Sequence, residues 1–94
     1  MIIVRNIFIA KPGFASKLAA QIKGALEAGG IQGTRVLTDV TGEYNRVILE
    51  MQLANMAEFD ASMQAYGTNQ AMREKLAGST DLWVTGTREI LKVM

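Results

Sequence analysis

The chain has 94 residues and a formal net charge of +1, and it contains neither cysteine nor histidine. That length suffices for one domain spanning 1–94, and the two missing residue types exclude disulfides, thiol nucleophiles, imidazole bases and Cys- or His-ligated metal and haem sites. The near-zero charge argues against nucleic-acid and membrane-surface partners, and no segment resembles a signal peptide or a membrane span of ~20 apolar residues, so we expect a cytoplasmic protein.

The first half of the chain alternates between strand and helix patterns. Residues 2–10 are rich in β-branched and aromatic side chains and end at a Lys-Pro-Gly turn, which predicts a strand. A helix-period apolar stripe follows and stops at Gly29-Gly30. Its members are Phe14, Leu18, Ile22, Ala25 and Leu26. Residues 31–39 and 44–53 then alternate with period 2 and form a hairpin through the polar turn at 39–42.

The second half repeats the helix and the strand. Asn55 can cap a helix whose first turn carries Glu58 as the partner in the cap. Gly67 interrupts this helix, and a shorter one restarts at Thr68 or Asn69. The inward stripe consists of Met56, Phe59, Met63 and Tyr66. Residues 82–93 return to strand-like content, in which Gly86 indicates a bulge or a close backbone approach.

The element order is therefore βαββαβ with a broken second helix. This order predicts a ferredoxin-like α+β fold, in which a four-stranded antiparallel sheet carries its helices on one face. The other face is also apolar, through Ile3, Ile7, Ile9, Leu37 and Ile48. Because a solvated face should alternate with polar residues, we expect a homodimer formed through this sheet face. The alternative is that these side chains are ordinary exposed hydrophobic residues.

The opening strand with its Lys-Pro-Gly turn and amphipathic helix resembles the dimeric α+β barrel superfamily. So does the run 46–53 (RVILEMQL) leading into 55–59 (NMAEF). The groups most similar in pattern are NIPSNAP-like and antibiotic-biosynthesis-monooxygenase-like proteins, and the resemblance covers residues 2 to about 93. It implies a dimeric barrel with a cavity between the sheet and the helices of each subunit. Since this fold hosts many activities, function must be argued from the site.

In cofactor-independent monooxygenases and haem degraders of this group, an Asn on the first strand points into the pocket, and Asn6 stands at a matching position. The resemblance implies a catalytic role for Asn6, whose alternative role is to satisfy a backbone group near a bulge. The candidate substrate contacts are Phe8, Arg46, Phe59, Met63, Tyr66 and Trp83. For Trp83 we favour core or dimer packing over substrate stacking.

Charged residues give two weaker signals. Arg5, Arg35 and Arg46 lie on three different predicted strands and could bind an anion if two of them converged. We favour cross-strand ion pairs instead, with Asp39, Glu43 or Glu50 as partners. The carboxylates show no ligand loop, so we expect no metal and no other cofactor.

The chain departs from the haem degraders in lacking a helical His, and from the monooxygenases in offering Phe59 and Tyr66 where they place a Trp on the second helix. The resemblance implies an enzyme-like homodimer that acts without a cofactor on a small hydrophobic or aromatic metabolite. The alternative is a non-catalytic domain for small-ligand binding or protein interaction. A pocket lined by Asn6 and an Arg or Tyr, with room for a ring, favours catalysis. A solidly packed interface between the sheet and the helices favours the alternative.

Overall fold

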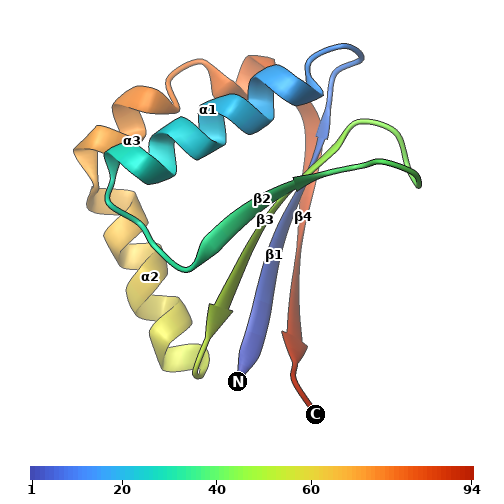
Figure 1. Cartoon of the computed structure of the whole chain (residues 1–94). Helices are drawn as coiled ribbons and strands as arrows, with labels where there is room; N and C mark the ends of the chain where they lie inside the picture. Colours follow the sequence, from blue (N-terminus) through green and yellow to red (C-terminus); the bar gives the residue numbers. More distant parts are fainter.

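The computed structural model describes residues 1–94. Its elements are β1 (Ile2–Ala10), α1 (Ala15–Ala28), β2 (Thr34–Thr38), β3 (Arg46–Leu53), α2 (Met56–Thr68), α3 (Gln70–Lys75), the 3-10 turn η1 (Ser79–Asp81) and β4 (Trp83–Lys92). The four strands form one antiparallel sheet in the order β2-β3-β1-β4. All helices lie on one face of this sheet and the other face is bare (Figure 1). The predicted ferredoxin-like α+β fold with a broken second helix is confirmed.

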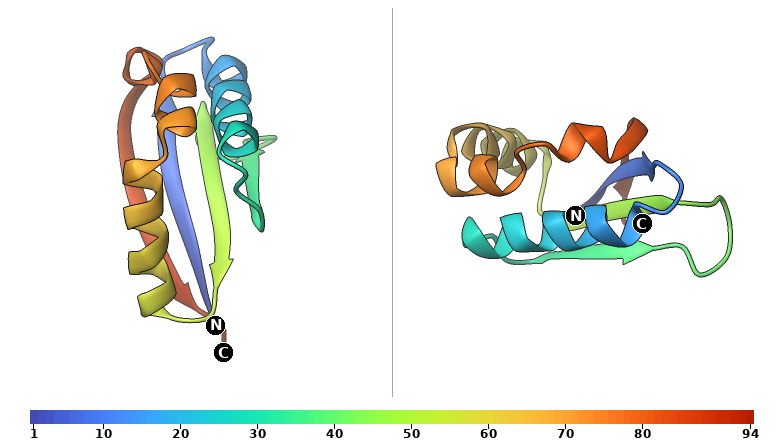
Figure 2. Two further views of the ribbon diagram at one scale, coloured as in Figure 1. Left: turned by 90° about the vertical axis from the view of Figure 1, so that its left-hand side faces the viewer. Right: turned by 90° about the horizontal axis from the view of Figure 1, so that it is seen from above.

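The helices and the sheet form two layers (Figure 2), and the core fills the space between them. Val4 and Val47 on the inner face of the sheet are fully buried, and Leu18 of α1 covers them at 1% exposure. Two members of the predicted helix stripes are instead exposed, Phe14 by 40% and Met56 by 48%. Both stand at the start of their helices, and because helical side chains lean toward the N-terminus, they project beyond the helix end.

The break in the second helix is at Asn69 and not at the predicted Gly67. Asn69 has an extended backbone (φ −79°, ψ 102°), and its Oδ1 accepts a hydrogen bond from the Met72 amide at 3.1 Å. Gly67 lies inside α2. The chain therefore changes direction where a side chain can cap the next helix, because the cap compensates for the lost helical hydrogen bonds. The predicted cap at Asn55 is confirmed, since its Oδ1 accepts from the Glu58 amide at 3.0 Å.

The bulge in β4 is at Val84 and not at the predicted Gly86. Ile9 pairs with Thr85 while Ala10 pairs with Trp83, so Val84 is the extra residue. The alternative prediction for Gly86, a close approach to a neighbouring backbone, is confirmed. A Cβ atom on Gly86 would lie 3.4 Å from the Ile7 carbonyl oxygen and 3.6 Å from the ring of Phe8. The missing side chain leaves the inner side of the sheet open beside Phe8.

The bare outer face carries the residues that the sequence assigned to it. The register pairs Ile7 with Ile48 and Ile48 with Leu37, so these side chains form a row across the sheet. The loop between β2 and β3 extends past the sheet on the side away from the helices (Figure 1). Both termini lie at one end of the sheet (Figure 1). None of the helices combines the length and the apolar character needed to cross a membrane.

Candidate functional site

An apolar cavity of about 200 Å³ lies between the sheet and the helices α1 and α3. The alternation of the strands and the apolar stripe of α1 direct their side chains into it, and Ser79 is its one polar residue. Its walls include Phe8, Leu18, Ile22, Leu49, Met72 and Trp83. Because an apolar cavity of about 150 Å³ holds benzene, this one has room for a ring with one or two further atoms.

A more open hollow of about 330 Å³ lies beside this cavity, over β1 and β4. Phe8 and Trp83 border both spaces, and their rings meet edge to face with centroids 5.4 Å apart. The remaining lining residues of the hollow are Asn6, Gly86, Thr87 and Arg88. The hollow thus places polar groups next to an apolar cavity.

Asn6 and Arg88 face each other across the β1–β4 pair in this hollow. The Arg88 Nε donates a hydrogen bond to the Asn6 Oδ1 at 2.6 Å. A guanidinium has only donors, so the amide must turn its oxygen toward Arg88. The Asn6 Nδ2 group makes no hydrogen bond. Because every buried side-chain nitrogen and oxygen of the structure has a hydrogen-bond partner, the unpartnered Nδ2 is not buried and is accessible as a donor.

Arg88 is the site residue that the sequence reasoning missed. Its guanidinium carbon lies 5.3 Å from the centre of the Phe59 ring, a cation–π contact. The ion pairs in the structure involve Arg5, Arg35 and Arg46, so Arg88 has no carboxylate partner. The hollow therefore contains one positive charge that the chain does not neutralise.

Arg46, a predicted substrate contact, does not reach this site. Its Nε donates to the Asp39 Oδ1 at 2.9 Å, and its backbone amide donates to Oδ2 at 3.3 Å. The strand alternation explains this position: the neighbouring Val47 is fully buried on the inner face, so Arg46 lies on the outer face. The Arg46 pair lines another hollow, of about 430 Å³, which the β2–β3 loop forms with the start of α1 and whose lining residues are mostly polar.

The three candidates on α2 are only partly in place. Phe59 reaches the site through its contact with Arg88. Met63 and Tyr66 pack against the core and line neither of the two inner spaces. The Tyr66 hydroxyl donates to the Met51 sulfur at 3.7 Å, and burial raises the pKa of this phenol above its usual 10.0. Tyr66 therefore stays neutral at physiological pH.

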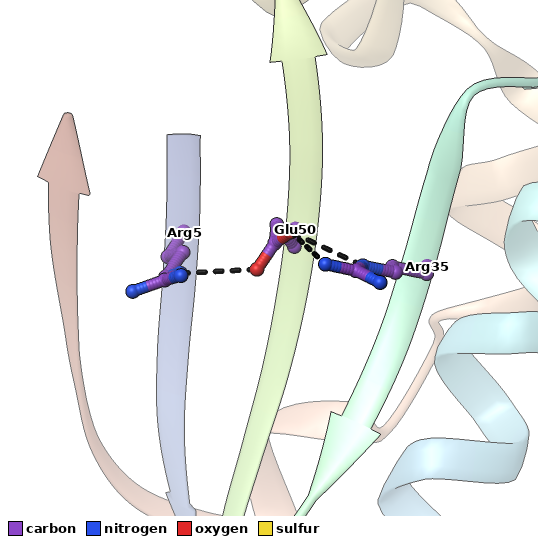
Figure 3. Close-up of polar contacts among 3 residues, drawn as sticks. All are labelled: Arg5, Arg35 and Glu50. Atoms are coloured by element: carbon purple, nitrogen blue, oxygen red, sulfur yellow. Dashed lines mark hydrogen bonds and ion pairs between the residues drawn. The ribbon is translucent and has the colours of Figure 1, made fainter. Parts of the chain in front are cut away.

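The outer face carries a separate group of charges. Glu50, only 7% exposed, accepts hydrogen bonds from Arg35 at 2.6 and 3.1 Å and from Arg5 at 3.0 Å (Figure 3). The bond from Arg35, assisted by Arg5, lowers the pKa of Glu50 below its usual 4.5 despite the opposing effect of burial. These pairs and the pair of Arg46 with Asp39 confirm the expected cross-strand ion pairs.

Nowhere in the structure do three or more Asp, Glu, Cys or His side chains come together as a metal-binding group. The polar side chains that line the two inner spaces are Ser79 in the cavity and Asn6, Thr87 and Arg88 in the hollow, where Asn6 and Arg88 form a hydrogen-bonded pair. Such a pair can donate hydrogen bonds to an anionic oxygen.

The fold has clear relatives among solved structures, although no protein-family model and no curated protein matches the sequence. An uncharacterized NIPSNAP domain protein from Burkholderia xenovorans is 11% identical, with a TM-score of 0.84 over 100% of this chain and 95% of that one. A NIPSNAP family protein from Agrobacterium tumefaciens is 12% identical, with a TM-score of 0.82 over 99% and 92%. A putative antibiotic biosynthesis monooxygenase from Chloroflexus aurantiacus is 13% identical, with a TM-score of 0.70 over 99% and 93%. In keeping with the resemblance in its sequence pattern, the chain has the ferredoxin-like α+β fold of NIPSNAP and antibiotic-biosynthesis-monooxygenase-like proteins.

Proposed function

We propose that the inner face of the sheet binds a small hydrophobic or aromatic molecule and that the protein acts on it as a cofactor-independent, monooxygenase-like enzyme. The observation that carries this proposal is the Asn6–Arg88 pair beside an apolar cavity with room for a ring. From the sequence, a pocket that is lined by Asn6 and an Arg or Tyr, with room for a ring, is the condition that favours catalysis; in the structure Asn6 and Arg88 line the hollow that borders the apolar cavity. The fold likeness to a putative antibiotic biosynthesis monooxygenase gives further support.

In this chemistry the bound substrate loses a proton to solvent, and the resulting enolate or phenolate transfers electrons to O₂. One oxygen atom bonds to the substrate and the other leaves as water. The accessible Asn6 Nδ2 donates a hydrogen bond to the substrate oxygen, and this hydrogen bond strengthens as deprotonation places negative charge there. Arg88 holds the amide in the orientation that makes this possible. The apolar walls of the cavity, with Phe8 and Trp83 at its border, hold the ring.

A thermal-shift screen of phenols, quinones and acyl compounds, followed by oxygen-uptake assays of the hits, tests this function. We expect Asn6→Ala to lower the oxygen-uptake rate at saturating ligand by about 10²- to 10³-fold, the usual effect of losing one oxyanion donor. Gln64→Ala is the matched control, because Gln64 is an exposed amide on α2 that lines neither space. A tight ligand that supports no oxygen uptake would overturn the oxygenase activity and leave the non-catalytic ligand-binding domain as the function.

We also propose that a second copy of the chain covers the outer face. The apolar row of Ile7, Ile48 and Leu37 needs a cover, and no element of the chain lies over it. The neighbouring row alternates in charge, because the register aligns Arg35, Glu50, Arg5 and Glu89 across the sheet. Such a neutral row is compatible with burial against an identical face, which a two-fold axis provides.

A further inference from the structure

Arg88 has unused hydrogen-bonding capacity. A guanidinium offers five N–H donors, and only the Nε donor of Arg88 is engaged, by Asn6. The donors on its two Nη atoms have no partner, and no carboxylate of the chain forms an ion pair with it. The side chain is thus free to bind an anion with the two Nη atoms.

The guanidinium is held in place before any ligand arrives. Asn6 fixes its Nε at 2.6 Å, and the ring of Phe59 lies against it at 5.3 Å from its central carbon. Phe59 is itself buried in the core, at 8% exposure. A side chain held in this way loses less conformational entropy on binding than a free surface arginine does.

The surroundings of Arg88 define the shape of the ligand. The apolar cavity behind Phe8 and Trp83 contains no charged group, and the hollow in front of them contains one charged group, Arg88. Gly86 has no side chain to fill the space beside the ring of Phe8. A molecule that spans both spaces therefore needs an apolar body and a single negative charge at one end.

We infer that the ligand is a monocarboxylate with an apolar body of about six to eight carbons, the size set by a cavity somewhat larger than the one that holds benzene. Its planar carboxylate accepts two parallel hydrogen bonds from the Nη atoms of Arg88. A phosphate dianion is a poorer fit, since the hollow offers neither a second cation nor a helix N-terminus. This inference rests on the ligand site proposed above and names the chemical class of its ligand.

Trp83 is the only tryptophan of the chain and borders both spaces, so its fluorescence reports binding directly. We would titrate the protein at pH 7 with octanoate and 3-phenylpropionate and with the matching alcohols, octan-1-ol and 3-phenylpropan-1-ol. Each acid is expected to bind about 10- to 100-fold more tightly than its alcohol, as a charge-assisted pair of hydrogen bonds provides.

Substitutions at Arg88 test whether this residue causes the tighter binding of the acids. Arg88→Met should bring the acid down to the affinity of the alcohol, while unchanged alcohol binding confirms that the variant is folded. Arg88→Lys keeps the positive charge but lacks the two parallel Nη donors, so it should retain only part of the preference for the acid. Arg73→Met is the control, because Arg73 is an exposed arginine of α3 that also lacks an ion pair and lines neither space.

The outcomes separate the two proposals. If acids and alcohols bind equally well and Arg88→Met changes neither, the carboxylate is the wrong ligand class and the hydrophobic site stands. If Arg88→Met still binds the acid more tightly than the alcohol, another group binds the carboxylate and the inference fails. If none of the four compounds alters the fluorescence, both the carboxylate and the proposed ligand site are wrong.

Discussion

Arg88 and Glu50 lie on opposite faces of the same sheet and differ in how their charges are compensated. Glu50 is surrounded by Arg35 and Arg5, so it needs nothing from outside the chain. Arg88 is held by an amide and a ring, which orient it and leave its charge unneutralised. Of the two, only Arg88 gains by binding an anionic ligand.

Glu50 should make the stability of the protein depend on pH in the acid range. Its pKa is lowered in the folded state, so its stabilisation is complete above the usual value of 4.5 and is lost as the pH falls through the folded pKa. The loss should be about 1 kcal/mol, because the Arg35 side chain is 69% exposed and water screens its charge.

Urea unfolding at a series of pH values between about pH 7 and pH 3 measures this contribution. In Glu50→Gln the corresponding part of the pH dependence should be missing. Glu27→Gln is the control, since Glu27 is exposed on α1, away from the outer face, and forms no ion pair. Equal pH dependence in the wild type and in Glu50→Gln would mean that the ion pairs contribute nothing to stability.

Strand alternation found some site residues and missed others. It placed Asn6 and Phe8 on the helix-facing side, where the structure has them. The same rule puts Arg46 on the face opposite Val47, so its candidacy for the inner site could have been rejected from the sequence. Arg88 was not foreseen for two reasons. The segment 82–93 has apolar residues at both odd and even positions, and the bulge at Val84 shifts the alternation, so the sequence does not show which side chains face the helices.

At the scale of the elements, Asn69 joins three parts of the helical layer. Its Oδ1 caps α3, and its Nδ2 donates to the carbonyl of Gly29 at the end of α1, at 3.2 Å. Gly29 also packs closely on α3, since a Cβ there would lie 2.8 Å from the Met72 sulfur. The position of α3 over the apolar cavity therefore depends on this junction.

We expect Asn69→Ala to lower the free energy of unfolding by about 2 kcal/mol, through the lost cap and the unpaired Gly29 carbonyl. Asn55→Ala is the comparison, because Asn55 caps α2 with one hydrogen bond and makes no second contact of this kind. It should cost about 1 kcal/mol. Urea unfolding of both variants tests the difference, and equal losses would show that the contact with Gly29 contributes no stability.

The order of the elements was predictable because each long element has a clear period. The stripe that includes Leu18 and Ile22 and the alternation of residues 46–53 determine the main helix and the central strand. The end of α2 was predicted less well. Glycine costs a helix about 1 kcal/mol, which is too little to end it at Gly67 when the capping residue comes two positions later.

At the scale of the whole molecule, the two faces of the sheet differ in the surfaces that they offer. The inner face leaves a cavity and a hollow that a small molecule can fill. The outer face has no cavity bordered by aromatic rings, and it joins an apolar row to a neutral row of charges. The two proposals therefore assign the ligand to the inner face, whose spaces are bordered by Phe8 and Trp83, and the second copy to the outer face.

The proposed dimer should dissociate when its apolar row is charged. Ile7 lies on β1 between Ile48 and Thr87, in the middle of the outer face. Ile7→Glu places a carboxylate there in each copy, and two unpaired carboxylates close to a two-fold axis repel each other and lose their hydration. Sedimentation at micromolar concentration should give twice the chain mass of 10.2 kDa for the wild type and the single mass for Ile7→Glu. Met56→Glu, on the exposed start of α2, should remain dimeric. A wild-type protein that sediments as a single chain would remove the case for an identical partner, and the apolar row would then be an ordinary exposed surface.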